Sequence, residues 1–240
     1  MAAVSGPIVR YRRGMPLLIL VRHGRTQANA SGILAGWTPG VHLDDQGQAQ
    51  ATAVAERLRP LSLSAIVTSP LERTVQTAEA IDQAQRRPPG LQVDERLGEC
   101  RYGEWTNRPL AELSKMPLWR TVQERPSAVT FPEGESLPAM QARALAAVYD
   151  WNGRLGDKAT YAMVSHGDVI KAIVADALGT HLDQFQRIVV DPASVSVIRY
   201  GARGVQVLHV NDRGSDLSAL ARTRTRRRVE GTVGGGSGEH

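Results

Sequence analysis

Short apolar runs alternate with amphipathic helical patterns along the chain, from about residue 17 to about residue 210. Three short apolar runs, at 17–21, 65–68 and 161–164, predict strands that are buried on both faces. Apolar positions at helical spacing predict four helices, over 46–59, from 71 to 81, from 137 to 155 and from 170 to 178. This alternation is typical of an α/β fold.

The last apolar segment changes to a period of two. Val195 and Val197 come before two glycines, Gly201 and Gly204, and Val205 and Val207 follow them. This pattern predicts a β-hairpin at the edge of the sheet. We therefore expect a three-layer α/β/α sandwich, with a mostly parallel central sheet and an antiparallel edge.

The composition of the chain ends suggests extensions on both sides of one domain. We expect an N-terminal extension over 1–14, a folded domain over 15–213 and a basic, glycine-rich flexible tail over 214–240. Residues 106–136 hold four prolines without a strong period. We interpret them as an insertion that lies over one end of the sheet.

Several classes of protein are excluded by what the sequence lacks. No apolar run approaches the roughly 18–20 residues of a membrane span. The apolar run at 15–21 is followed by Arg22 rather than by a cleavage site, so we predict a cytoplasmic protein without a membrane partner. The single cysteine, Cys100, excludes a disulfide framework.

The basic character of the chain belongs to its ends. The net charge is +5 and the isoelectric point about 9.8. The segments 1–15 and 213–240 hold nine of the 29 basic and three of the 24 acidic residues, which leaves a charge of −1 for 16–212. A nucleic acid would therefore bind only through the arginines of the tail, between Arg222 and Arg228, and salt-sensitive binding would reveal it. A solvated tail is the favoured interpretation.

Polar residues of unusual type follow the three predicted parallel strands. Arg22 and His23 end the first strand, His166 ends the third, and Arg73 lies shortly after the second. The carboxyl ends of parallel strands meet at one edge of a sheet, so these side chains are expected to converge. Arg73 in the first turn of a helix is disfavoured by the helix dipole, and a bound anion would offset that cost.

Each of these residues also has an ordinary structural interpretation. A single histidine at a strand end is more often structural than catalytic, and a single arginine is more often on the surface. We expect Ser69 and Asp168 to be helix N-caps, with Pro70 in the first helical position, and Gly24 to permit the turn after the first strand. The other histidines lack metal-ligand spacing, and no GxxxxGK[ST], GxGxxG or GxSxG motif is present.

Five sequence blocks stand out along the chain: RHGRT at 22–26 with Asn29, SPLERT at 69–74 with QTA at 76–78, ERLGE at 95–99 with GEW at 103–105, GES at 134–136, and VSHG at 164–167. With these blocks the chain resembles the histidine phosphatase superfamily, in its phosphoglycerate-mutase-like branch with an RHG motif. The blocks are in the family's order, and the resemblance spans about 17–210. The chain is also similar to an actinobacterial subgroup described as probable phosphoglycerate mutases.

The resemblance implies a role for each catalytic candidate. His23 would attack phosphorus and become phosphohistidine, and Glu99 would donate and later accept a proton. The phosphoryl oxygens would be held by Arg22, Arg73 and His166. Asn29 and the backbone at Gly167 would assist them. Such chemistry needs positioning and charge neutralisation, which two arginines and an imidazole supply without a metal or cofactor.

Other residues are candidates for binding the rest of a small-molecule phosphate ester. These are Arg25, Thr26, Trp37, Arg101, Tyr102, Trp119 and Glu135. Arg25 and Arg101 would accept a second anionic group, with a solvated surface role as the alternative for both. A phosphate dianion next to Glu99 would raise the pKa of its carboxyl group, which favours activity at mildly acidic pH.

The short, proline-rich segment 106–136 does not match the longer insertion of true phosphoglycerate mutases, so we favour hydrolysis. A phosphomutase is the first alternative. A non-catalytic phosphate-recognising or nucleic-acid-associated protein is the second. A homodimer is left open.

Overall fold

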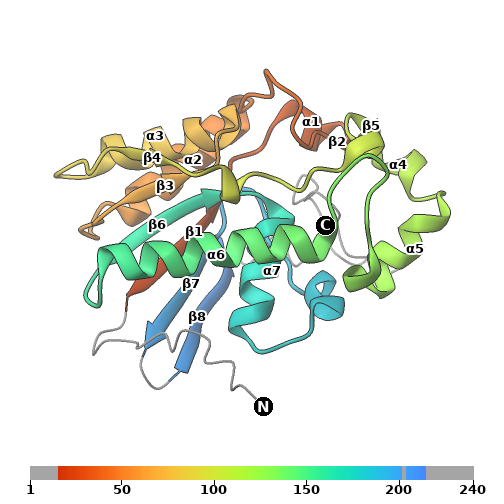
Figure 1. Ribbon diagram of the computed structural model, residues 1–240. Coiled ribbons are helices and arrows are strands. Elements are labelled where there is room, and N and C mark those ends of the chain that lie inside the picture. Colours follow the sequence, from red (N-terminus) through yellow and green to blue (C-terminus); the bar gives the residue numbers. More distant parts are fainter. Residues whose placement is uncertain (1–15, 202–203, 215–240) are drawn as a thin grey trace, which may run out of the picture.

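A six-stranded sheet forms the centre of the computed structural model, which describes residues 16–201 and 204–214. The order across the sheet is β4-β3-β6-β1-β7-β8, and Figure 1 shows its strands running through the molecule. The first four are parallel to one another, and β7 pairs antiparallel with both of its neighbours, β1 and β8. The strands are β1 (Leu17–Arg22), β3 (Ile66–Thr68), β4 (Leu91–Val93), β6 (Thr160–Ser165), β7 (Val195–Gly201) and β8 (Gly204–Asp212).

Successive residues of the central strands enter two different cores, because side chains alternate between the faces of a sheet. In β1, Leu18 and Leu20 belong to the larger core, and Ile19 and Val21 belong to the smaller one. This is why the run of 17–21 is apolar throughout rather than alternating.

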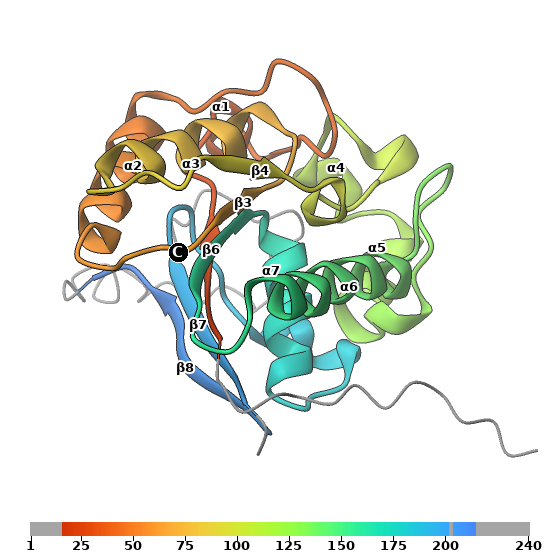
Figure 2. The same ribbon diagram turned by 60° about the vertical axis from the view of Figure 1, so that its left-hand side comes forward.

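Helices cover both faces of the sheet and complete the three layers (Figure 2). Helices α2 (Asp45–Leu58) and α3 (Glu72–Ala84) pack on one face, over the smaller core. Helices α6 (Leu137–Leu155) and α7 (Gly167–Ala177) pack on the other face, over the larger core. The predicted three-layer α/β/α fold with an antiparallel edge is confirmed.

Most of the smaller elements, between residues 27 and 34 and between residues 108 and 124, lie away from the β7–β8 hairpin in both views (Figures 1 and 2). Helix α1 (Gln27–Ala30) precedes β2 (Ile33–Leu34), which pairs with β5 (Arg108–Pro109) in a two-stranded sheet. Segment 106–136 continues with α4 (Leu110–Leu113), α5 (Pro117–Glu124) and η3 (Pro126–Ala128). The remaining 3₁₀ turns are η1 (Glu95–Leu97), η2 (Gly103–Trp105) and η4 (Leu182–Arg187).

The structure also adds elements that the pattern did not predict. β4 is the parallel edge strand, and its residues Gln92 and Val93 are exposed, so it has no apolar run to reveal it. The predicted extension over 1–14 and nearly all of the predicted tail over 214–240 lie outside the described residues. Within the described ranges, no helix has the length and apolarity needed to cross a membrane.

Candidate active site

Three parallel strands end at the same level of the sheet and deliver the candidate residues to one place. Arg22 at the end of β1 is in register with Ser165 at the end of β6, and Thr68 of β3 is in register with Val164. Just beyond, the backbone N–H of His23 donates to the Ser165 carbonyl at 3.0 Å. The predicted convergence is confirmed.

His23 presents one ring nitrogen to the arginine next to it. Its Nδ1 lies 2.7 Å from the carbonyl oxygen of Gly24, and Arg73 Nε donates to its Nε2 at 3.3 Å. A carbonyl can only accept and a guanidinium can only donate, so these contacts place the proton on Nδ1 and a lone pair on Nε2. Burial, together with the charges of Arg73 and Arg22, lowers the pKa of His23 well below its ordinary value. The ring is therefore neutral.

His166 lies beside His23, with the ring centres 5.2 Å apart. Its Nε2 is 2.8 Å from Ser69 Oγ, and its Nδ1 is 3.3 Å from Arg73 Nη2. Burial and the charge of Arg73 lower its pKa as well. The prediction that Ser69 caps a helix was wrong: α3 begins at Glu72 with Leu71 in the cap position, and the Ser69 hydroxyl instead orients His166.

Two buried guanidinium groups make the site cationic. Arg22 is 1% exposed and donates from Nη1 to the Val190 carbonyl at 2.7 Å; burial lowers its pKa to about 10. Arg73, 2% exposed, donates from Nη2 to the Gly36 carbonyl at 2.8 Å. Its Nη1 is buried and has no hydrogen-bond partner among the described residues. Such a donor is costly to leave unpaired, and an anionic oxygen would satisfy it.

Glu99 is the buried acid of the site. Its carboxylate Oε1 accepts the backbone N–H of Cys100 at 2.9 Å. Burial, and secondly the negative charge of Asp168, raise the pKa of Glu99 to about 7, against the opposing effect of the two arginines. The side chain is thus close to half-protonated at neutral pH, which suits a group that must give and take a proton.

The carbonyl of Glu99 is fixed from two sides. It accepts from Trp37 Nε1 at 2.5 Å and from Arg143 Nη2 at 2.9 Å. Arg143 also forms an ion pair with Glu135 at 2.6 Å. Glu135 therefore lies against the Glu99 segment, and its charge is balanced by an arginine from α6.

The other predicted binding residues occupy different settings. Thr26 and Asn29 cap α1 reciprocally, and Gly167 is the first residue of α7. Arg25 Nε is paired with Asp44 at 2.9 Å. Arg101 is exposed and holds its guanidinium carbon 4.0 Å above the ring of Trp37.

Two groups of functional interest escaped the sequence analysis. Asp168 is not an N-cap, because His166 occupies that position. Its side chain is buried and accepts a hydrogen bond from the Tyr102 hydroxyl at 2.8 Å. Lys171 follows one helical turn later and pairs with Asp168. A lysine within an otherwise apolar helix is the sequence signal that could have predicted this buried ion pair. Arg143 gave no signal, since an arginine on an amphipathic helix is ordinarily solvated.

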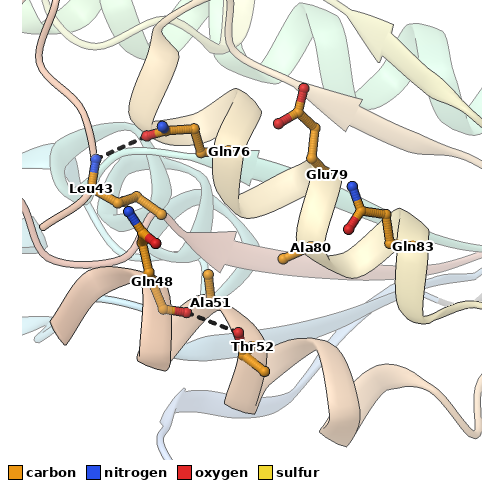
Figure 3. Close-up of a pocket in the computed structure, with 8 residues that line it drawn as sticks. All are labelled: Leu43, Gln48, Ala51, Thr52, Gln76, Glu79, Ala80 and Gln83. Carbon is orange, nitrogen blue, oxygen red and sulfur yellow. Dashed lines mark hydrogen bonds between the residues drawn. The ribbon is translucent and has the colours of Figure 1, made fainter. Parts of the chain in front are cut away.

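A surface groove of about 270 Å³ lies between α2 and α3, separate from these groups (Figure 3). Uncharged polar and small apolar side chains line most of it, with Gln48 on the α2 side and Gln76 and Gln83 on the α3 side. Gln76 is already bonded to the backbone of Leu43 at 2.9 Å. None of the catalytic candidates lines this groove.

Comparisons with known proteins agree with this geometry. The family described as "Histidine phosphatase superfamily (branch 1)" matches residues 18–213. Phosphoserine phosphatase 1 of Hydrogenobacter thermophilus is 32% identical over 82% of this chain and 92% of its own length. Glucosyl-3-phosphoglycerate phosphatase of Mycolicibacterium vanbaalenii is 31% identical over 70% of this chain and 76% of its own.

Two further similarities extend the comparison. The probable phosphoglycerate mutase GpmB of Enterobacter sp. is 33% identical over 75% of this chain and 83% of its own length. The solved structure of Bacillus stearothermophilus YhfR has a TM-score of 0.75 at 29% identity, over 82% of this chain and 97% of that chain. By its five motif blocks, its strand-end geometry and these matches, the chain belongs to the histidine phosphatase superfamily, branch 1.

Proposed function

We propose that this chain hydrolyses a small phosphomonoester through a phosphohistidine on His23. One observation carries the proposal: a buried, neutral imidazole holds its proton on Nδ1 against Gly24 and presents Nε2 to a guanidinium. That nitrogen is the only ring position able to attack. Membership of a family whose relatives include named phosphatases supports the same reaction class.

In the first step, the Nε2 lone pair of His23 forms a bond to phosphorus as the bond from phosphorus to the ester oxygen breaks. Glu99, protonated, gives its proton to the departing oxygen. Arg22 and Arg73 balance the charge on the three equatorial oxygens, which is the main demand of phosphoryl transfer, and the neutral His166 helps to hold these oxygens in place. The unpaired Nη1 of Arg73 gains a partner in this step.

In the second step, water attacks the phosphohistidine. Glu99, now a carboxylate, takes a proton from that water as the P–N bond breaks and inorganic phosphate forms. The electron pair returns to Nε2 of His23, so the enzyme ends in its starting state. One carboxyl group serves both steps because its pKa of about 7 lies near the working pH.

The rest of the substrate meets Trp37 and Arg101. The Trp37 ring is fixed by its hydrogen bond to the Glu99 carbonyl and supports the Arg101 guanidinium. This arrangement supports a second anionic group on the substrate, bound by Arg101. Arg25 is the weaker candidate for that role, because Asp44 already balances its charge. Asn29, Thr26, Glu135 and Gly167 remain binding residues of the proposal.

Hydrolysis is favoured over phosphoryl return to the substrate because segment 106–136 is short. In our proposal these residues are an insertion over the active site, and they fold into only short elements. A phosphomutase is the second candidate, and the identity with GpmB proteins favours it. The similarity of this chain to an actinobacterial subgroup is also a proposal. The GpmB relatives come from other bacteria, among them Enterobacter and Yersinia.

A substrate screen with wild type and His23→Ala tests the function. Phosphorylated metabolites, including 3-phosphoglycerate and phosphoserine, are assayed for release of inorganic phosphate and, for 3-phosphoglycerate, for isomerisation. We expect phosphate release by the wild type and a loss of at least about 10³-fold in kcat for His23→Ala, because the nucleophile is gone.

A matched variant separates chemistry from folding. His209→Ala removes an exposed histidine of β8 and is expected to keep wild-type turnover. Turnover that survives in a folded His23→Ala variant would contradict the proposed nucleophile. Isomerisation of 3-phosphoglycerate faster than phosphate release would establish the phosphomutase instead.

A further inference from the structure

Next to the active site lies a buried cluster that the mechanism above does not use. Asp168 is 1% exposed and Lys171 is 2% exposed. Lys171 Nζ lies 3.5 Å from Asp168 Oδ1 and donates to Gln186 at 3.1 Å. The Tyr102 hydroxyl donates to Asp168 Oδ2 at 2.8 Å. Burying charged side chains such as Asp168 and Lys171 costs free energy, so we expect this pair to serve a function.

The Tyr102 bond connects two parts of the site that are distant in sequence. Tyr102 lies three residues after Glu99, on the same loop segment. Asp168 lies two residues after His166, in the first turn of α7. Because Tyr102 is fully buried, this bond fixes the loop that carries the acid to the helix that carries the phosphate-binding histidine.

Several charged or titratable groups act on the Glu99 carboxyl group. They come from β1, α3, α7 and the loop itself: Arg22, Arg73, Asp168, Lys171, Cys100 and Tyr102. The cations favour the carboxylate of Glu99, whereas Asp168 opposes them. A general acid placed between two arginines would otherwise lose its proton before the substrate arrives.

We propose that Asp168 is a positioning residue for the general acid, Glu99. Asp168 anchors the Glu99 loop through Tyr102 and keeps the Glu99 carboxyl group protonated before the substrate binds. The raised pKa of Glu99, to about 7, agrees with this role, since the charge of Asp168 is its second cause after burial. The inference rests on the proposed function of Glu99.

The pH dependence of kcat/KM for an alkyl phosphate tests the inference, with Asp168→Asn as the variant. The alkaline limb of kcat/KM reports the acid of the free enzyme. Without the negative charge, Glu99 loses its proton at lower pH. We expect the limb to move down by about half a pH unit or more, so that kcat/KM above the limb falls about threefold or more.

A second variant tests the anchoring separately and serves if Asp168→Asn does not fold. Tyr102→Phe removes only the hydroxyl. We expect kcat for an alkyl phosphate to fall about tenfold or more with little change in KM, because the acid loses its alignment. The pre-steady-state burst with 2,4-dinitrophenyl phosphate should stay near the wild-type rate, because that leaving group needs no proton.

Asp176→Asn makes the same chemical change at the far end of α7 and should leave both readouts at wild-type values. An unmoved alkaline limb in a folded Asp168→Asn variant overturns the inference, and so does an equal loss for alkyl and dinitrophenyl esters in Tyr102→Phe. Either result would leave wild-type phosphatase activity intact, whereas failure of the proposed function would show as an inactive wild type.

Discussion

Burial lowers the pKa values of the histidines in the site and raises the pKa of its carboxylic acid. The two imidazoles, His23 and His166, are kept neutral because burial and the nearby arginines disfavour another positive charge. The buried carboxyl group of Glu99 keeps its proton up to about pH 7. One physical cause thus sets the protonation states of both the proposed nucleophile and the proposed acid.

This state of Glu99 has a measurable effect on stability. Its pKa is about 7 in the folded chain and near 4.5 when unperturbed, so the folded state binds the proton more tightly. The protonated Glu99 side chain therefore stabilises the folded state. This contribution to the free energy of unfolding is fully present below about pH 4 and is lost as the pH rises through 7. Glu99→Gln cannot titrate, so the free energy of unfolding of the variant relative to wild type should rise between pH 5 and pH 8, by up to about 3 kcal/mol.

Urea unfolding at the two pH values, in buffers without phosphate, measures this difference. The same variant should lose about 10²- to 10⁴-fold in kcat on alkyl phosphates, because the amide cannot donate the proton. A stability difference that is equal at pH 5 and pH 8 would show that Glu99 is not a buried, titrating acid.

At the scale of elements, the turn after β1 depends on space rather than on conformational freedom. Gly24, predicted to permit the turn, is not among the glycines with a positive φ. A Cβ there would instead collide with the carbonyl oxygen of Gly47, at the beginning of α2, and a Cβ on Gly47 would collide with the carbonyl of Arg25. The two glycines allow the turn after His23 and α2 to pack backbone against backbone.

Gly24→Ala should therefore destabilise the fold by about 1–3 kcal/mol and displace His23, because the obstacle is backbone that cannot rotate away. Gly153→Ala is the matched control: Gly153 lies in α6 with nothing within 4 Å of an added Cβ. Alanine there should stabilise the helix by about 0.5–1 kcal/mol. Chemical denaturation of both variants checks the opposite signs, and equal effects would refute the close-approach explanation.

At the scale of the whole molecule, the described residues contain both cores and all six strands of the sheet. The sheet ends at β8, whose last residue is Asp212, and Arg57 of α2 pairs with that residue at 2.9 Å. The net charge of −1 over 16–212 contrasts with +5 for the full chain. The segment 16–212 is thus nearly neutral, and the excess positive charge lies at the two ends of the chain.

A chain of residues 15–214 is therefore expected to unfold cooperatively and to keep kcat/KM within about twofold of the full chain, because it retains both cores of the described residues and every proposed site residue. Any salt-sensitive binding of RNA should be lost with the tail arginines. Thermal unfolding and phosphatase assays of the two chains measure this. A large loss of activity would assign the ends a part in catalysis.

The hydrophobic pattern and the motif blocks were sufficient to predict the three-layer fold and the meeting of His23, Arg22, Arg73 and His166. Both depend on local regularities: apolar runs mark buried strands, and parallel strands end at one edge. Glu99 was recognised only by family resemblance, because a glutamate in a loop has no periodic pattern around it.

The tertiary structure alone decided the partners of these residues. Tyr102 and Asp168 are 66 positions apart, and Arg143 meets the Glu99 carbonyl from 44 positions away. The tertiary structure also decided that β4 is a strand, because it pairs with the edge of β3. It decided as well that residue 24 must be glycine, because a larger residue would collide with the backbone of α2. Contacts between distant segments leave no periodic trace in the sequence, because each partner by itself also fits an ordinary solvated or capping role.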